Sequence, residues 1–189
     1  MSKLEIVASL LGLISVWLTT KQNIWCWPIG IIMVAAYAFI FYEARLYSDL
    51  MLQLVYVVMQ FYGWYYWIYG NKNSEELKVT QLSSQQIMMW TIVLIVGSIV
   101  LGWLMKKYTN ADLPYWDATT TAMSLIAQWL MTKKIIENWI LWIVADVLYV
   151  GVYFYKHLYP TTILYAVFIG LCFLGLRDWK KELKTVLVR

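Results

Sequence analysis

Apolar residues fill seven segments of the chain, and polar stretches separate them. The segments span residues 4–20, 24–42, 50–69, 87–105, 118–131, 135–155 and 161–176. A helix that crosses the roughly 30 Å hydrocarbon core of a bilayer needs about 20 mostly apolar residues. The pattern therefore predicts an all-α membrane protein with seven transmembrane helices, of which the shorter ones tilt or thin the bilayer locally. The longest polar connection, at 71–86, is typical of a linker.

The composition strengthens this interpretation. Of the 189 residues, 62% are hydrophobic and 14% are charged, whereas soluble domains have roughly 45–50% apolar and about 25% charged residues. A chain with so little polar surface is not expected to stay in water. The 12 Trp and 15 Tyr residues exceed what two interfacial aromatic belts need, so some of them should line an internal site.

The distribution of basic residues predicts the topology, because loops rich in Lys and Arg stay in the cytoplasm. With seven spans, the side of the N-terminus would hold five of the 15 Lys and Arg residues, and the other side would hold ten. The C-terminus is therefore expected in the cytoplasm and the N-terminus in the periplasm. No cleavable signal peptide is expected, and the net charge of +4 is too dispersed to indicate nucleic acid as a partner.

The first three segments resemble the last three. The stretch 17–21 (Trp-Leu-Thr-Thr-Lys) resembles 129–133 (Trp-Leu-Met-Thr-Lys), an offset of 112 residues. The same offset relates Leu46-Tyr47 to Leu158-Tyr159, Phe61 to Phe173, Gly63 to Gly175 and Trp67 to Trp179. Between these blocks, Asn23 and Trp27 are expected to match Asn138 and Trp142, with three further residues absorbed in loops.

This repeat predicts a 3+1+3 arrangement. A single linker helix gives both three-helix units the same orientation in the membrane, as in transporters whose site lies between two parallel repeats. The predicted division is a first repeat at 1–70, a linker loop and helix at 71–110, a second repeat at 111–179 and a basic cytoplasmic tail at 180–189. Transport would follow from rocking of the two repeats about a central site.

The main candidate for a site lies in the sixth segment. Trp139, Trp142 and Asp146 are spaced by three and then four residues, which places them on one face of a helix. A carboxylate deep in a membrane helix is costly, so it is expected to serve a function. Indole faces attract cations and stack on flat rings. Together they favour a small, flat, cationic aromatic ligand, although helix packing would give the same pattern.

Polar residues of other segments are candidates for the same pocket. Gln53, Tyr56 and Gln60 follow helical spacing in the third segment, and polar side chains in lipid turn towards other helices or a cavity. Two interpretations are open for Gln128 and Asn138. Each side chain either joins two helices or forms hydrogen bonds with a polar ligand.

An acidic residue occurs at this position in one repeat only. On the matching above, the counterpart of Asp146 in the second segment is Ile31. A single carboxylate suits an asymmetric ligand with one positive charge. Pro28 and Gly30, near the start of the second segment, offer either a hinge or simple packing.

The sequence does not favour an enzyme. It shows no nucleophile motif, phosphate-binding loop or paired intramembrane carboxylates. With one histidine, His157, and with Cys26 and Cys172 in apolar segments, no metal site, disulfide or other cofactor is expected. A retinal protein would need a lysine deep in the last helix, and the seventh segment has none. The short loops also argue against a signalling scaffold.

Several features together resemble the PnuC family of bacterial vitamin transporters. They are the 3+1+3 plan, the Asn-Trp-x-x-Trp-x-x-x-Asp motif at 138–146, Tyr47-Ser48-Asp49 followed by Gln53, and Gly-Trp-Tyr-x-Trp at 63–67. The similarity covers nearly the whole chain. It implies a fold similar to a duplicated SWEET-type unit, with Trp139, Trp142 and Asp146 as substrate contacts. It implies weaker contacts from Asn138, Gln53 and Gln128.

The resemblance also implies a function. Members of the family carry nicotinamide riboside, a form of vitamin B3, and relatives carry vitamins such as thiamine. We expect facilitated diffusion of nicotinamide riboside across the bacterial inner membrane, with a cytosolic kinase that traps the vitamin by phosphorylation for NAD biosynthesis. The alternatives are another cationic aromatic vitamin such as thiamine, and a proton-coupled carrier that uses Asp146. The expected partners are the small-molecule substrate and membrane lipid, with homo-oligomerisation left open.

Overall fold

The computed structural model describes residues 3–43, 45, 47–70, 77–109, 113–155, 157 and 159–188. The side chains of Tyr47, Ser48 and residues 186–188 are not part of the description. The predicted repeat pair Leu46 and Leu158, and residues 71–76 of the predicted linker, lie outside the described residues.

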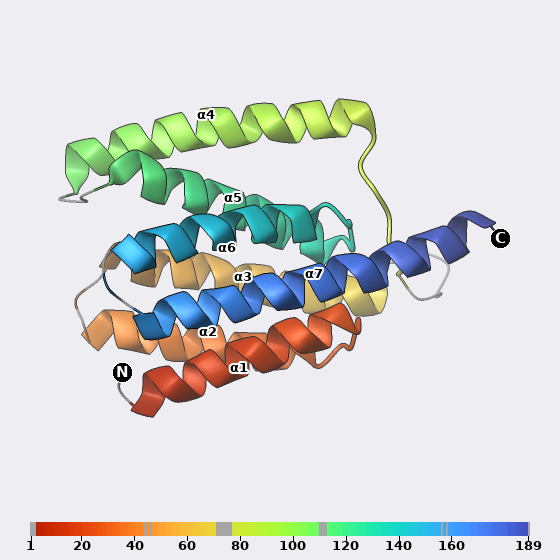
Figure 1. Cartoon of the computed structure of the whole chain (residues 1–189), viewed down its shortest axis with the longest axis horizontal. Coiled ribbons are helices and arrows are strands. Elements are labelled where there is room, and N and C mark those ends of the chain that lie inside the picture. The colour runs from red at the N-terminus through yellow and green to blue at the C-terminus, as the bar shows by residue number, and fades with distance from the viewer. Residues whose placement is uncertain are drawn as a thin grey trace. The chain divides into compact units, whose positions relative to one another are not determined.

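The described residues form seven helices (Figure 1), which confirms the predicted all-α fold. They are α1 Lys3–Thr20, α2 Cys26–Glu43, α3 Tyr47–Tyr69, α4 Ser84–Tyr108, α5 Pro114–Thr132, α6 Asn138–Tyr155 and α7 Tyr159–Val188. The predicted end of the last segment at residue 176 was wrong, because α7 has 30 residues and continues through the basic stretch to Val188. Charged side chains at the end of an apolar run do not stop a helix.

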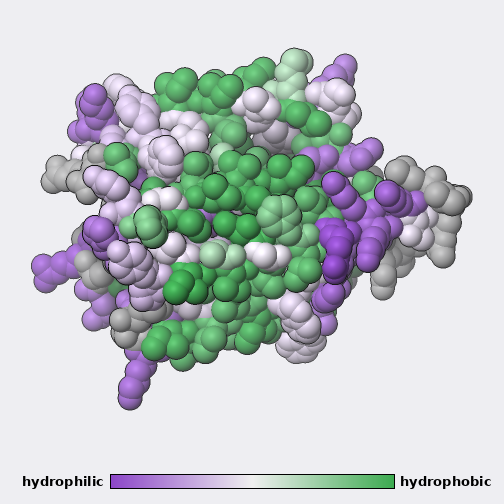
Figure 2. Space-filling model, viewed as in Figure 1, coloured by the Kyte–Doolittle hydropathy of each residue, from purple (hydrophilic) through white to green (hydrophobic). Residues whose placement is uncertain are grey.

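Five of the helices, α1, α2, α4, α6 and α7, are long and apolar enough to cross a membrane. Figure 2 shows hydrophobic surface over the middle of the helices and hydrophilic surface near their ends. The same criterion does not select α3 and α5, which carry polar side chains such as Gln53, Gln60 and Gln128 within the helix. A membrane location for all seven helices therefore stays a prediction.

The chain divides into two compact units, and the first comprises residues 1–78, 132–134 and 174–189. Within it, α2 packs against both α1 and α3. The rings of Trp27 and Trp67 meet edge to face with centroids 5.2 Å apart. Trp179 of α7 lies 6.3 Å from Trp67 and donates a hydrogen bond from Nε1 to the Thr19 carbonyl at 3.2 Å. Trp179 thus joins α7 to α1 and α3, and the Trp27–Trp67 contact joins α2 to α3.

The second unit comprises residues 79–131 and 135–173. A capping box formed by Ser83 and Gln86 starts α4. Gly102 of α4 meets Tyr115 of α5 so closely that an added Cβ would lie 2.3 Å from the ring. Tyr149 of α6 and Tyr165 of α7 have ring centroids 5.0 Å apart. These contacts pair α4 with α5 and α6 with α7.

The connection before α4 is anchored within the second unit. Val79 is fully buried, and the Thr80 carbonyl accepts a hydrogen bond from Ile136 N at 2.9 Å. The Glu137 carboxylate accepts a further bond from Leu82 N at 3.2 Å. This part of the predicted linker is therefore held against the start of α6.

Backbone geometry repeats with the predicted offset of 112. Gln22 and Lys134 both have a left-handed backbone, with φ of 53° and 51°. Arg45 and His157 form a second such pair, with φ of 59° and 58°. Non-glycine residues rarely adopt this conformation, so two pairs at one spacing mark equivalent turns.

The hydrogen bonds around the first pair of turns match as well. Asn23 N bonds the Leu18 carbonyl and Ile135 N bonds the Leu130 carbonyl, both at 3.0 Å. Helices α2 and α6 also begin and end at the same offset, at Cys26 and Asn138 and at Glu43 and Tyr155. The repeat therefore continues through the second helix of each set without a shift.

The predicted shift of three residues between the repeats was wrong. The turns make Trp139, not Trp142, the counterpart of Trp27, and they make Val34, not Ile31, the counterpart of Asp146. The prediction matched Asn and Trp side chains by identity, whereas the loops that it needed to absorb three residues are equal in length. The asymmetry of charge remains, because Val34 is apolar and buried.

Candidate functional site

The candidate face of α6 is turned towards the protein. Trp139 is 1% exposed and Asp146 is 5% exposed, and Trp142, between them along the helix, is half-buried. Burying a carboxylate is costly unless it has hydrogen bonds or a cation. The buried Asp146 carboxylate therefore needs a partner that compensates for the hydration it has lost.

The thiol of Cys172 on α7 supplies one contact. Its Sγ lies 3.7 Å from Asp146 Oδ2 and is oriented as a hydrogen-bond donor. Among the described residues, no lysine or arginine forms a salt bridge with Asp146. A thiol is a weak donor, so the carboxylate retains most of its capacity for a cationic partner.

Two buried amides of the second unit have polar atoms without a hydrogen-bond partner among the described residues. They are Gln128 Nε2 on α5 and Asn138 Oδ1 at the start of α6. Asn138 uses its Nδ2 to donate to the Ile135 carbonyl at 2.6 Å. A buried polar atom without a partner costs roughly 1–3 kcal/mol, so both amides are suited to bind water or a polar ligand.

The other predicted site residues belong to α3 in the first unit. Gln60 is 6% exposed, and Gln53 and Tyr56 are half-buried. The Gln60 amide lies against Gly30 of α2, where an added Cβ would be 2.8 Å from Nε2. Glycine at residue 30 thus leaves the space that the amide occupies. A common ligand for these residues and those of α6 stays a prediction.

Sequence reasoning missed two contributors near Asp146. Cys172 was placed in an apolar segment of the sequence but was not recognised as a partner of the carboxylate. Tyr149, one turn after Asp146 on the same helix, stacks with Tyr153 at 6.0 Å, and both rings approach Tyr165 of α7. The equivalence of Cys172 and Gln60 at an offset of 112 is the signal that could have drawn attention to the thiol.

Comparison with known proteins gives a consistent result. A family model described as nicotinamide mononucleotide transporter matches residues 2–181. The nicotinamide riboside transporter PnuC of Escherichia coli is 26% identical over 204 aligned positions, which cover 95% of this chain and 85% of that protein. The riboflavin/roseoflavin transporter RibM of Streptomyces davaonensis is 25% identical, over 93% of this chain and 83% of that protein.

A solved structure shares the fold. The crystal structure of the vitamin B3 transporter PnuC superposes with a TM-score of 0.79 at 28% identity, and the match covers 96% of this chain and 82% of that one. The family model spans nearly the whole chain, and the structural match does so as well. The chain therefore belongs to the PnuC family of membrane transporters, the family whose model is described as nicotinamide mononucleotide transporter.

Proposed function

We propose that this protein carries nicotinamide riboside across the bacterial inner membrane by facilitated diffusion. The observation that carries the proposal is the buried face of α6, where Asp146 has two tryptophans, Trp139 and Trp142, within two turns of it. The similarity to nicotinamide riboside transporters agrees with this substrate. Phosphorylation of the vitamin by a cytosolic kinase would keep the inward gradient.

The chemistry of the substrate suits this face. Nicotinamide riboside consists of a flat cationic pyridinium ring, a carboxamide and a ribose. The pyridinium would stack on an indole and neutralise the Asp146 carboxylate. A cation–π contact contributes up to roughly 2 kcal/mol when it is desolvated. The moderate size of this term suits a carrier, because a ligand that binds too tightly is not released.

Polar groups of the substrate would meet the buried amides. Gln128 Nε2 is a donor and Asn138 Oδ1 is an acceptor, and neither has a hydrogen-bond partner among the described residues. A carboxamide offers both an acceptor and a donor, and ribose hydroxyls offer the same. We further propose that Gln53, Tyr56 and Gln60 contribute polar contacts from the first repeat, and that all seven helices span the membrane as 3+1+3 with a cytoplasmic C-terminus.

Other vitamins are the main rivals. Thiamine is also a cationic aromatic molecule, and it would use the same carboxylate. Riboflavin, named for the relative RibM, is neutral and would gain nothing from Asp146. A proton-coupled carrier that uses Asp146 is a third reading, and it predicts that dissipating the proton gradient abolishes uptake.

Uptake of labelled nicotinamide riboside into proteoliposomes tests the proposal. We expect saturable uptake that excess unlabelled nicotinamide riboside suppresses, that riboflavin does not suppress, and that a protonophore does not change. Stronger suppression by thiamine than by nicotinamide riboside would reassign the substrate. Loss of uptake in the presence of the protonophore would show that transport is coupled to protons and is not facilitated diffusion.

A further inference from the structure

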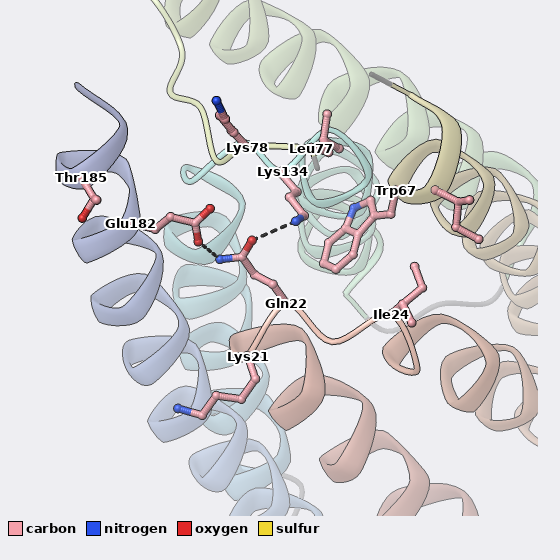
Figure 3. Close-up of a pocket in the computed structure, with 10 residues that line it drawn as sticks. Lys21, Gln22, Ile24, Trp67, Leu77, Lys78, Lys134, Glu182 and Thr185 are labelled. Atoms are coloured by element: carbon pink, nitrogen blue, oxygen red, sulfur yellow. Dashed lines mark hydrogen bonds between the residues drawn. The ribbon is translucent and has the colours of Figure 1, made fainter. Parts of the chain in front are cut away.

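A hollow lies entirely within the first unit. It has a volume of about 700 Å³, and its wall includes Lys21, Gln22, Trp67, Lys78, Lys134 and Glu182 (Figure 3). Ligand pockets of proteins usually measure roughly 300–1,000 Å³. The hollow therefore has the size of a small-molecule site.

The wall of this hollow is rich in positive charge. Three of the lining side chains are lysines and one is a glutamate. The charge of Lys21 is partly neutralised, because its ammonium lies 2.8 Å from the Asp178 carboxylate. The stretch of α7 that contributes Glu182 also carries the exposed Lys180, Lys181 and Lys184. Such a concentration of cations attracts anions.

A polar network holds the hollow in shape. Gln22 donates to Glu182 and accepts a hydrogen bond from Lys134 Nζ at 2.9 Å, as Figure 3 shows. Lys134 is 8% exposed, and its ammonium lies 4.6 Å from the centre of the Trp67 ring. Gln22 and Lys134 are also the equivalent left-handed residues of the two repeats. Strained turns and a buried ammonium thus meet at one place, as they often do at functional sites.

We propose that this hollow binds a phosphate group. Lysine ammonium groups bind phosphate oxygens as point charges, and the second N–H of the Gln22 amide in the same wall can add a hydrogen bond. The phosphate belongs either to a monoester of nucleotide size or to the headgroup of an anionic phospholipid. The count of basic residues predicts that Lys21, Lys78 and Lys134 lie on the cytoplasmic side, where phosphorylated vitamins and anionic headgroups both occur. The inference goes beyond the proposed function, because it concerns another site and needs no transport.

Binding to the purified full chain tests the inference. The probe is adenosine 5′-monophosphate, with adenosine as the control that lacks phosphate, measured by calorimetry in nanodiscs of phosphatidylcholine. We expect the monophosphate to bind and adenosine to bind at least tenfold more weakly. Nanodiscs that contain phosphatidylglycerol distinguish the sources: if the headgroup fills the hollow, monophosphate binding falls and the melting temperature rises.

Matched lysine variants locate the site. The double variant Lys21→Gln and Lys78→Gln changes two exposed side chains and leaves the buried Lys134 in place. The control is Lys106→Gln with Lys107→Gln, since these exposed lysines line a separate hollow beside Trp103 and Tyr115. We expect the first pair to weaken binding of the monophosphate, or stabilisation by phosphatidylglycerol, at least fivefold, and the control pair to change it less than twofold. Equal effects of the two pairs, or no response to either phosphate source, would overturn the inference.

Discussion

The Cys172 thiol and the Asp146 carboxylate are in contact, with Sγ 3.7 Å from Oδ2. Cys172 is 3% exposed and Asp146 is 5% exposed, so the pair lies in the interior. The contact joins α6 to α7 within the second unit. We infer that the thiol orients the carboxylate without neutralising it, which makes Cys172 a positioning residue for a cationic substrate.

Replacing Cys172 should change affinity according to the donor that remains. Cys172→Ala removes the donor and leaves Asp146 free to rotate, so the dissociation constant for nicotinamide riboside should rise about three- to tenfold. Cys172→Ser keeps a donor and should stay within about twofold of the wild type. Calorimetry in detergent measures both. Cys26→Ala is the control, because Cys26 is the other buried cysteine and lies in the first unit; equal effects at residues 26 and 172 would contradict a positioning role.

Gly63→Ala should destabilise the first unit. An added Cβ would lie 2.1 Å from the Trp27 ring, which is fully buried and cannot move without disturbing Trp67. Overpacking of this kind costs about 1–3 kcal/mol, so the melting temperature in detergent should fall by several degrees. Gly151→Ala is the control, since nothing lies within 4 Å of its added Cβ and alanine favours a helix. A melting temperature that is unchanged in Gly63→Ala would contradict the close packing of α2 on α3.

Gly30→Ala should act through the Gln60 amide. The added Cβ would meet the end of a flexible side chain, with 2.8 Å to Nε2 and 3.0 Å to Oε1. The amide can move away, so the melting temperature should change little, while affinity for the substrate falls because Gln60 is displaced. The variant should have no further effect on affinity in a Gln60→Ala background, which a double-mutant cycle measures. Additive losses of affinity would show that Gly30 acts independently of Gln60.

Trp142→Ala should weaken binding of the pyridinium ring. The loss of a desolvated cation–π contact of up to roughly 2 kcal/mol corresponds to an increase in the dissociation constant of about 10- to 30-fold. Trp142→Phe keeps an aromatic face and should lose less. Trp25→Ala, at an indole that is 64% exposed, is the matched control and should bind as the wild type does. Calorimetry with nicotinamide riboside separates these outcomes, and an unaltered affinity in Trp142→Ala would remove this residue from the site.

Local patterns were enough to predict the helices. Apolar segments predicted seven helices whose starts lie within about four residues of those observed, but polar residues hid the end of α7. Helix ends depend on caps such as Ser83 and Gln86 and on packing by Trp179, which hydropathy does not report. The offset of 112 was visible in residue identities, whereas the register of the second helix needed the left-handed turns at Gln22 and Lys134.

The candidate site was predictable in part for the same reason. A carboxylate and two indoles on one helix face can be recognised from spacing alone, and Asp146 and Trp139 are indeed buried. Contacts between helices cannot be read from spacing, so the thiol of Cys172 was missed. The hollow beside Lys134 is lined by stretches that are far apart in the chain, at residues 21–24, 67–68, 77–78, 134 and 182–185. Only the folded chain brings them together.

Asp146→Asn tests the central claim most directly, because asparagine is nearly isosteric and removes only the charge. The measurement is the affinity for nicotinamide riboside by calorimetry, with initial uptake into proteoliposomes at equal protein content and with the melting temperature as a check on folding. We predict an unchanged or higher melting temperature, a dissociation constant at least tenfold higher than in the wild type, and a corresponding loss of uptake at low substrate concentration. Wild-type affinity and uptake in a folded Asp146→Asn variant would contradict the assignment of the buried carboxylate as the partner of a cationic vitamin.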